Sequence, residues 1–350
     1  MTTPGTHPAW LLGARGAPSP HNTQPWRFAP AADGRIVVRW DPARTLPAGD
    51  PTDRDLYLAL GAAVESARLR ALLAFVPLAF APAPDDAPAT VGTLVPGDDP
   101  DASPDDPRMA AMLDRRQTGR APHLHRPIPT GLADRLTAEA ARFGCGFHLM
   151  TDRRRLARLA RLARAATAAQ FADPAVHAEL WRWLRLDPHN LAYQRDGLTA
   201  DCLELRGAAL QVARLALPPA RMRWLSRLGA HRLLALDTGT TVRRSASMCL
   251  LTLAEQAPAR GDLVRAGRGL LRLWLLAADS GLTTHPVSAL LDRAATVAPT
   301  LAVFGCAGRY PAAVYRMGAT PPPARAPRLP AAELLILGSP DRMTTPEATP

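Results

Sequence analysis

The segment APSPHNTQPWRF, residues 17–28, stands directly before the first predicted strand and guides the interpretation of the whole chain. Pro18 and Pro20 fix their own φ and restrict the residue before each of them, so the backbone is stiff and extended. Such a backbone can lie flat along a planar ligand. Ser19, Asn22 and Gln24 add hydroxyl and amide groups that can pair with the edge of a heteroaromatic ring. An ordinary loop entering a hairpin remains the alternative interpretation.

Size and composition set the class of protein. The chain has 350 residues, 47% of them hydrophobic, which is enough for one large domain or two ordinary ones. No apolar run reaches the length of a membrane span, and the N-terminus lacks the pattern of a secretory signal. We therefore expect a cytoplasmic protein with no membrane partner. The four cysteines are scattered without a Cys-x-x-Cys pair, so we expect buried thiols and no metal site.

The net charge of +11 comes from arginine alone, because the chain contains no lysine. Heavy use of Ala, Arg and Pro indicates a GC-rich genome. A positive charge raises the possibility of nucleic-acid binding. However, no basic run is interleaved with aromatic residues, and no zinc finger or helix-turn-helix pattern is present. We expect no nucleic-acid partner, since a small ligand that carries a phosphate explains clustered arginines equally well.

Periodicity predicts the elements of the N-terminal part. Residues 26–40 are typical of a β-hairpin around an Asp-Gly turn. Residues 53–75 have helical apolar spacing, and a strand-like run follows at 76–80. Residues 82–108 are rich in Pro, Asp and Gly and are the best candidate for a linker, with a possible short strand at TVGTLV.

A second block follows. Its pattern predicts a strand at GFHLMTD, residues 146–152, and a buried strand at TLAVFGCAG, residues 300–308. The predicted helices are 129–143, the amphipathic 152–172, a long helical region that continues to about residue 234, and 265–282.

A weak internal repeat links the two blocks. RLRALLAFVPL, residues 68–78, is similar to RLWLLAADSGL, residues 272–282, at a constant offset of 272 − 68 = 204. Chance similarity between two helices rich in Leu and Ala is one explanation. The other is a chain of two related halves that pack as a fused dimer.

Three further segments carry candidate binding groups. In RRQTGR, residues 115–120, the guanidinium groups of Arg115, Arg116 and Arg120 can each bind a phosphate, and Thr118 adds a hydroxyl. GLTTHPVS, residues 281–288, is predicted to be an irregular turn that carries backbone N–H groups to a ligand. RAPRLP, residues 325–330, adds a further arginine. Taken singly, each segment is equally compatible with a solvated turn.

Taken together, these segments resemble the FMN-dependent nitroreductase family. PSPHNTQPW is similar to its Pro-Ser-x-x-Asn-x-Gln-Pro-Trp segment, and RRQTGR resembles its Arg-Arg-Ser-x-Arg phosphate motif. GLTTHP and RLPAAELL resemble its glycine turn and its closing segment. The order of the motifs differs from ordinary members, in which the arginine motif comes first. This order and the Arg-Arg-x-Thr-x-Arg spacing resemble the fused Acg-like branch of actinobacteria.

The resemblance implies an α+β nitroreductase-like fold of two related halves. Each half would hold a mainly antiparallel sheet flanked by helices, and the halves would pack as an internal pseudo-dimer. Residues 1–108 would form the first half and supply the ring-contacting loop. Residues 109–350 would form the second half and supply the phosphate arginines, with a lid insertion at about 181–234. The chain would act as a monomer or associate further as a homodimer.

The resemblance also implies the cofactors and the residues that hold them. FMN would be the cofactor and NAD(P)H the electron donor. The cofactor-binding residues would be Pro18, Ser19, Pro20, Asn22, Gln24, Arg115, Arg116, Thr118, Arg120, Pro286 and Arg328. Thr283 and Ser288 stand where the family has glycines, which would narrow the approach to the flavin. The flavin carries the chemistry, so no catalytic side chain is certain, and His285 is the candidate.

Two functions follow from the resemblance. The first is an NAD(P)H oxidoreductase that passes hydride through FMN to a small-molecule substrate such as a nitroaromatic or a quinone. The alternative is a flavin-sequestering protein of the stress or dormancy type with little or no turnover. A lid that covers the flavin would favour the second.

Overall fold

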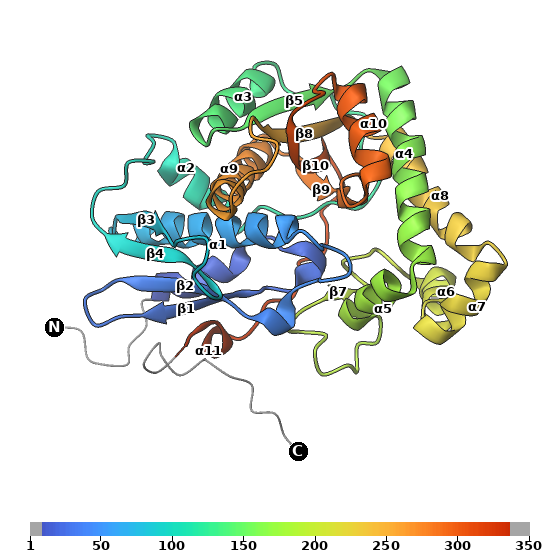
Figure 1. Ribbon diagram of the computed structural model, residues 1–350, viewed down its shortest axis with the longest axis horizontal. Helices are drawn as coiled ribbons and strands as arrows, with labels where there is room; N and C mark the ends of the chain where they lie inside the picture. Colours follow the sequence, from blue (N-terminus) through green and yellow to red (C-terminus); the bar gives the residue numbers. More distant parts are fainter. Residues whose placement is uncertain (1–8, 337–350) are drawn as a thin grey trace.

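A computed structural model of the chain describes residues 9–336. It contains two four-stranded antiparallel sheets and a layer of helices around each (Figure 1). The first sheet has the order β1-β2-β4-β3 and the second β5-β8-β10-β9. Antiparallel sheets in both the N-terminal and C-terminal parts agree with the predicted α+β class. The strands are β1 Trp26–Pro30, β2 Ile36–Trp40, β3 Leu78–Pro82, β4 Thr90–Pro96, β5 Gly146–Met150, β8 Ser247–Leu253, β9 Thr283–Pro286 and β10 Tyr310–Gly318.

Two helices of 20 residues, α1 (Arg54–Leu73) and α9 (Arg260–Asp279), pack against each other at the centre of the molecule (Figure 1). Both are buried on most of their surface, as expected for helices with neighbours on all sides. Two glycines permit the close approach of the backbones. A Cβ on Gly61 would lie 2.0 Å from the Val264 carbonyl oxygen, and one on Gly267 would lie 2.2 Å from that of Leu58.

A buried ion cluster joins the same two helices. Glu65 of α1 is fully buried and accepts hydrogen bonds from Arg68 at 2.7 Å, Arg268 at 3.0 Å and Arg272 at 2.8 Å. Asp106 at the start of α2 pairs with both Arg68 and Arg272. The pKa of Glu65 is depressed because the three arginines outweigh its desolvation. Arg68 and Arg272, which share the offset of the sequence repeat, therefore meet at one carboxylate.

The second sheet is covered by helices on both faces. Cys249, Leu251 and Leu253 of β8 belong to the main core with α1 and α9. Met248 and Leu250 point to a second core, which α4, α8 and α10 complete. A strand buried on both faces has a continuous apolar sequence without alternation. This explains why the sequence pattern did not reveal β8.

The remaining helices surround these layers. α3 and α9 contact each other beside β5, whereas α4 packs against α8 and α10. α5 packs against α7, and the short parallel pair β6 and β7 lies in the same region. None of the helices in the described part of the chain is both long and apolar enough to cross a membrane. The bounds are α2 Asp106–Met112, α3 Leu132–Arg142, α4 Arg153–Ala172, α5 Pro174–Trp183, α6 Gly207–Ala216, α7 Pro219–Arg227, α8 Ala230–Arg243, α10 Ala294–Phe304, α11 Ala331–Leu334, β6 Leu184–Arg185 and β7 Leu198–Thr199.

The hairpin, the helix at 53–75 and the strand at 146–152 agree with the sequence patterns. The short strand expected at TVGTLV is confirmed as β4, but the linker expected at 82–108 around it is wrong, because β4 pairs with both β2 and β3. The buried strand expected at 300–308 is also wrong: residues 294–304 form α10, whose Leu301 and Phe304 face the second core. A short apolar run has the same appearance in a buried helix as in a buried strand.

The long helical region expected up to residue 234 is interrupted. After α5 the chain forms β6, turns and β7 before helices resume at Gly207. The turn expected at 281–288 is largely the edge strand β9, which pairs with β10. Residue 108, the expected boundary, lies inside α2, and α2 contacts both α1 and α9.

The end of the described chain returns to the first sheet. Leu335 forms a parallel bridge with Phe28 of β1, and the Ile336 N–H donates to the Phe28 carbonyl at 2.8 Å. α11 contacts β1 in the same place. The C-terminal segment thus carries Arg328 past the loop at 18–24 on its way to β1.

Candidate functional site

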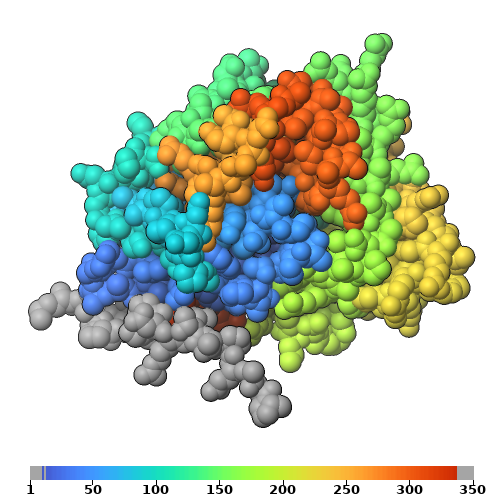
Figure 2. Space-filling model, viewed as in Figure 1, coloured from blue at the N-terminus to red at the C-terminus, as the bar shows by residue number. Residues whose placement is uncertain are grey.

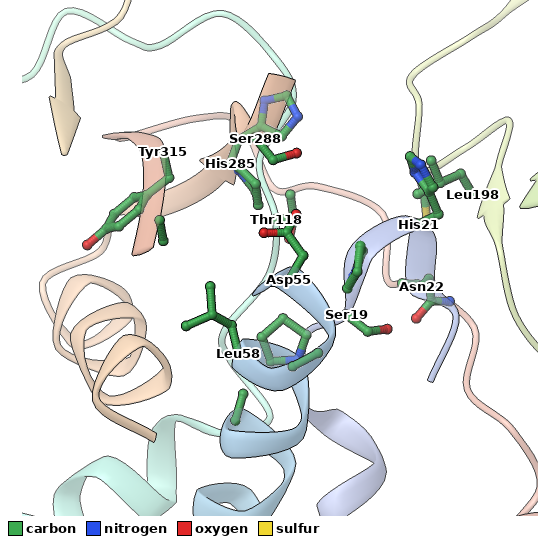
Figure 3. A pocket seen from close by; sticks show the side chains of 18 of the residues that line it. Ser19, His21, Asn22, Asp55, Leu58, Thr118, Leu198, His285, Ser288 and Tyr315 are labelled. Carbon is green, nitrogen blue, oxygen red and sulfur yellow. The ribbon is translucent and has the colours of Figure 1, made fainter. Parts of the chain in front are cut away.

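One cavity of about 720 Å³ brings together the segments that the sequence analysis singled out. This volume lies within the range of small-molecule and cofactor sites. Figure 3 shows Ser19, Asn22, Thr118 and His285 around it, supplied by segments from both ends of the chain. Of the twelve residues proposed from the sequence, ten line the cavity: Pro18, Ser19, Pro20, Asn22, Arg116, Thr118, Arg120, His285, Pro286 and Arg328.

The other two proposed residues lie elsewhere. Arg115 is exposed and does not line the cavity. Gln24 is fully buried behind the loop, where its Nε2 donates to the Arg195 carbonyl at 3.0 Å and its Oε1 accepts from the Leu329 N–H at 2.9 Å. Gln24 therefore joins three segments of the chain and does not face a ligand.

The loop at 18–24 is held in a strained conformation. His21, Asn22 and Gln24 have φ of 48°, 56° and 51°, a region that side chains other than glycine enter at a cost. The Gln24 N–H donates to Ser19 Oγ at 2.9 Å, which closes the loop on itself. Strain of this kind persists only where surrounding contacts enforce it.

Asn22 supplies most of those contacts. Its Nδ2 donates to the carbonyls of Gly197 at 3.2 Å and Pro327 at 2.9 Å, and its Oδ1 accepts from Arg328 Nη1 at 2.6 Å. Both polar atoms of the Asn22 amide therefore form hydrogen bonds within the protein. The expectation that this amide pairs with a ring edge has no support in these bonds, although Asn22 does lie at the cavity wall.

Two arginines form a cationic end of the cavity. Arg116 is 7% exposed and donates from Nη2 to the Gly16 carbonyl at 3.2 Å, while its Nε and Nη1 have no partner among the described residues. Arg328 donates to Asn22 and to the same Gly16 carbonyl. Neither forms an ion pair with a carboxylate in the described part of the chain. Burial lowers the pKa of Arg116 to about 9 and that of Arg328 to about 10.

Arg120 also lines the cavity, and a backbone carbonyl holds its side chain in place. Its Nη1 donates to the Cys202 carbonyl at 2.9 Å, and burial lowers its pKa. Gly119 fits closely beside β9, because a Cβ there would lie 2.3 Å from Thr283 Oγ1. The Gly119 N–H donates to the Thr284 carbonyl at 3.2 Å. The arginine motif and the β9 segment are thus joined edge to edge.

Arg316 of β10 organises this junction, and the sequence analysis did not identify it. Its side chain is fully buried and donates to the carbonyls of Gly119 and Ala121, both at 2.9 Å, and to His285 Nδ1 at 3.0 Å. Its signal in the sequence is a lone arginine within the apolar strand YPAAVYRMG. Because Nδ1 of His285 accepts this bond, Nε2 carries the ring proton.

His285 remains neutral near pH 7. Burial lowers its pKa well below the ordinary value of 6.5, and the charges of Arg120 and Arg316 act in the same direction. Thr283, expected to narrow the site, points instead to the Gly318 carbonyl at 3.1 Å and does not line the cavity. Ser288, the other substituted position, does line it.

An acidic end of the cavity was also missed by the sequence analysis. Arg54 at the start of α1 pairs with Asp55 and Asp292, both at 2.8 Å. Burial, together with the charge of Asp55, raises the pKa of Asp50 and Asp292 to about 7. The run DPTDRD at residues 50–55 is its signal in the sequence. The cavity lining therefore contains a cationic group, with Arg116 and Arg328, and an acidic group, with Asp50, Asp55 and Asp292.

Comparisons with known proteins complete the description. No protein-family model matches the chain. The chain is 29% identical over 279 residues to an uncharacterized protein of Mycobacterium tuberculosis (strain CDC 1551 / Oshkosh). The match covers 78% of this chain but 37% of that protein, so the chain spans little more than a third of its relative's length.

Similar solved structures include several flavoproteins. The FMN-dependent nitroreductase NfnB from Mycobacterium smegmatis in complex with NADPH matches with 20% identity and a TM-score of 0.38, over 66% of this chain and 99% of that chain. The FMN- and NADPH-dependent NfnB from sphigopyxis sp. strain HMH matches with 17% identity and a TM-score of 0.39, over 66% and 99%. Iodotyrosine deiodinase bound to FMN and 3-iodo-L-tyrosine matches with 12% identity and a TM-score of 0.36, over 63% and 94%.

Proposed function

We propose that the chain binds FMN in this cavity and acts as an NAD(P)H-dependent oxidoreductase of the nitroreductase superfamily. The observation that carries the proposal is Arg116, a buried cation with two N–H groups that have no hydrogen-bond partner among residues 9–336. An unpaired charge in the interior costs several kcal/mol. A phosphate beside Arg116 and Arg328 would supply the missing anion and acceptors in charge-assisted bonds.

The residues of this chain would divide the work of holding FMN. Arg116 and Arg328, with Arg120 and Thr118, would bind the phosphate. Pro18, Ser19 and Pro20 would form a stiff wall for the ring, since prolines resist displacement. The cavity supports this division because the motifs that resemble the family's flavin segments all border it. Asn22 and Gln24 act by holding the loop in its strained shape.

Bound FMN would supply hydride chemistry, from NAD(P)H to a nitroaromatic, quinone or similar electrophile. The protein's own contribution is orientation and charge. His285 is a neutral donor through Nε2, fixed by Arg316. Arg120 lines the cavity close to His285, and its positive charge would stabilise negative charge that develops on a bound group.

A flavin-sequestering protein is the second candidate, and the segment at 195–204 favours it. Leu198 and Cys202 line the cavity, while Gly197 and Cys202 accept hydrogen bonds from Asn22 and Arg120. Residues 195–204 are part of the proposed lid at 181–234, and they would cover a bound flavin. α7, another part of the proposed lid, packs on α5 and α8 and does not line the cavity. A closed cover would hinder access of substrate.

We also propose the two-half organisation, with residues 1–108 and 109–350 related as a pseudo-dimer. Two observations support it: Arg68 and Arg272, which are aligned in the sequence repeat, both pair with Glu65, and they lie on two helices of equal length. The motif order and the Arg-Arg-x-Thr-x-Arg spacing of residues 115–120 support assignment to the Acg-like branch. One FMN would then lie between the halves of one chain.

An absorption spectrum of the purified protein, repeated anaerobically after addition of NADPH, tests the proposal. We expect a flavin band that bleaches promptly. A band that persists would favour the sequestering protein. Failure to retain flavin after incubation with FMN would refute both candidates.

A further inference from the structure

Three consecutive helices, α6, α7 and α8, expose large apolar side chains to solvent. Each helix contributes a pair at a spacing of three or four residues: Val212 and Leu215, Trp224 and the α7 C-cap residue Leu228, and Leu233 and Leu236. Trp224 is 58% exposed, Leu228 70% and Leu233 68%. Residues three or four apart lie on the same side of a helix, so each pair forms an outward stripe. We call these six residues and the arginines between them the α6–α8 face.

The charge of this face is predominantly positive. No acidic residue occurs from 206 to 236; Asp237 follows directly. Six arginines lie in the same stretch, Arg206, Arg214, Arg221, Arg223, Arg227 and Arg232. Arg223, Arg227 and Arg232 are exposed beside the apolar pairs. Figure 2 shows the helices, in yellow, as a projecting edge of the molecule away from the N-terminal sheet.

We propose that the α6–α8 face binds the surface of an anionic lipid bilayer. Exposed Trp and Leu beside arginines are typical of helices that lie in the membrane interface, where apolar side chains enter the headgroup region and cations meet anionic lipids. This is peripheral binding and requires no spanning helix.

Other occupants fit the face less well. A symmetric second copy would bring the arginines of both faces together with far fewer carboxylates, such as Asp237, to oppose them, which is unfavourable. A nucleic acid would use the arginines but would leave the exposed leucines without a partner. An anionic bilayer satisfies both features at once.

The face is separate from the cavity, because none of residues 206–236 lines it. Membrane binding and FMN binding are therefore measured independently. Variants on the α6–α8 face should retain FMN if the proposed function is correct, and failure of one proposal leaves the other intact.

Co-sedimentation with phosphatidylcholine vesicles, with and without phosphatidylserine, tests the proposal on the full chain. Two variants separate the contributions. Trp224→Ser with Leu228→Ser removes apolar area without changing charge. The second variant combines Arg221→Glu, Arg223→Glu and Arg227→Glu and reverses the charge of α7. The matched control is Arg154→Glu, Arg155→Glu and Arg158→Glu on α4, whose arginines are exposed without exposed large apolar neighbours. Circular dichroism verifies that each variant is folded.

We expect binding that requires phosphatidylserine and weakens with salt. Since each basic residue near the surface contributes roughly fivefold, the reversal on α7 should weaken the partition by about a hundredfold or more. The Ser variant should weaken it by about tenfold or more, and the α4 control by much less than the α7 reversal. Equal losses in the α4 and α7 reversals would overturn the proposal, because the net charge alone would then explain binding. Binding unaffected by the Ser pair, or a dimer in vesicle-free solution that this pair abolishes, would also overturn it.

Discussion

Arg116 and Arg115 are neighbours in the chain but have opposite surroundings. Arg116 is buried at the cavity with unpaired N–H groups, whereas Arg115 is exposed. Residues in the turn that follows a short helix, here α2, cannot be assigned to one side from spacing alone. The contrast between the two arginines provides a matched pair for mutation.

We predict that Arg116→Met weakens FMN binding by about tenfold to a hundredfold, since a charge-assisted hydrogen bond contributes about 1.5–3 kcal/mol. The same change should raise the melting temperature of the FMN-free protein, because it removes an unpaired buried charge. Fluorescence titration and thermal denaturation measure the two effects. Arg115→Met is the control, and equal weakening in both variants would contradict the assignment.

His285 provides a test of pH dependence. Its folded pKa lies well below the unfolded value of 6.5, so its contribution to stability is complete above 6.5 and is lost as the pH falls toward the folded pKa. His285→Asn keeps an acceptor for Arg316 and removes the titration. We predict that the melting temperature of the wild type, relative to this variant, decreases from about pH 7 to about pH 5. Exposed His125→Asn is the control, and a constant difference for His285→Asn would reject the prediction.

At the scale of elements, the crossing of α1 and α9 depends on two glycines. We predict that Gly61→Ala or Gly267→Ala lowers the free energy of unfolding by about 1–3 kcal/mol or more, because the new methyl group would overlap a backbone carbonyl. Gly261→Ala in the first turn of α9 meets open space and should be neutral or stabilising. Urea denaturation measures all three. Equal effects at Gly261 and Gly267 would show that the crossing is not the cause.

The elements also show which local patterns can be interpreted. The hairpin at 26–40 follows from two β-prone runs around an Asp-Gly turn, and α1 from apolar residues that recur at helical spacing over 20 residues. β8 and α10 lack this contrast because apolar neighbours cover them. The strand at TVGTLV was recognised, but the stretch 82–108 around it was interpreted as a linker because it is rich in Pro, Asp and Gly; pairing on both edges places β4 inside the sheet.

At the scale of the whole molecule, both ends of the chain and the centre meet at one cavity. Pro18 belongs to the proposed first half and Thr118 and His285 to the proposed second half, and Arg328 arrives with the segment that returns to β1. We predict one FMN per chain, measured as flavin absorbance against protein concentration from amino-acid analysis. A ratio of two would contradict a single site shared by two halves.

The sequence by itself determined the local conformations and the chemical groups available. Proline geometry, helical periodicity and clustered arginines act over a few residues, so the stiff loop at 18–24, α1 and the RRQTGR segment were predictable. Only the tertiary structure decided which groups face the cavity. It turned Arg116 inward and Arg115 outward, used Gln24 as a link to Leu329, and brought Arg316 to His285. These choices depend on contacts between residues far apart in the chain, which local spacing does not encode.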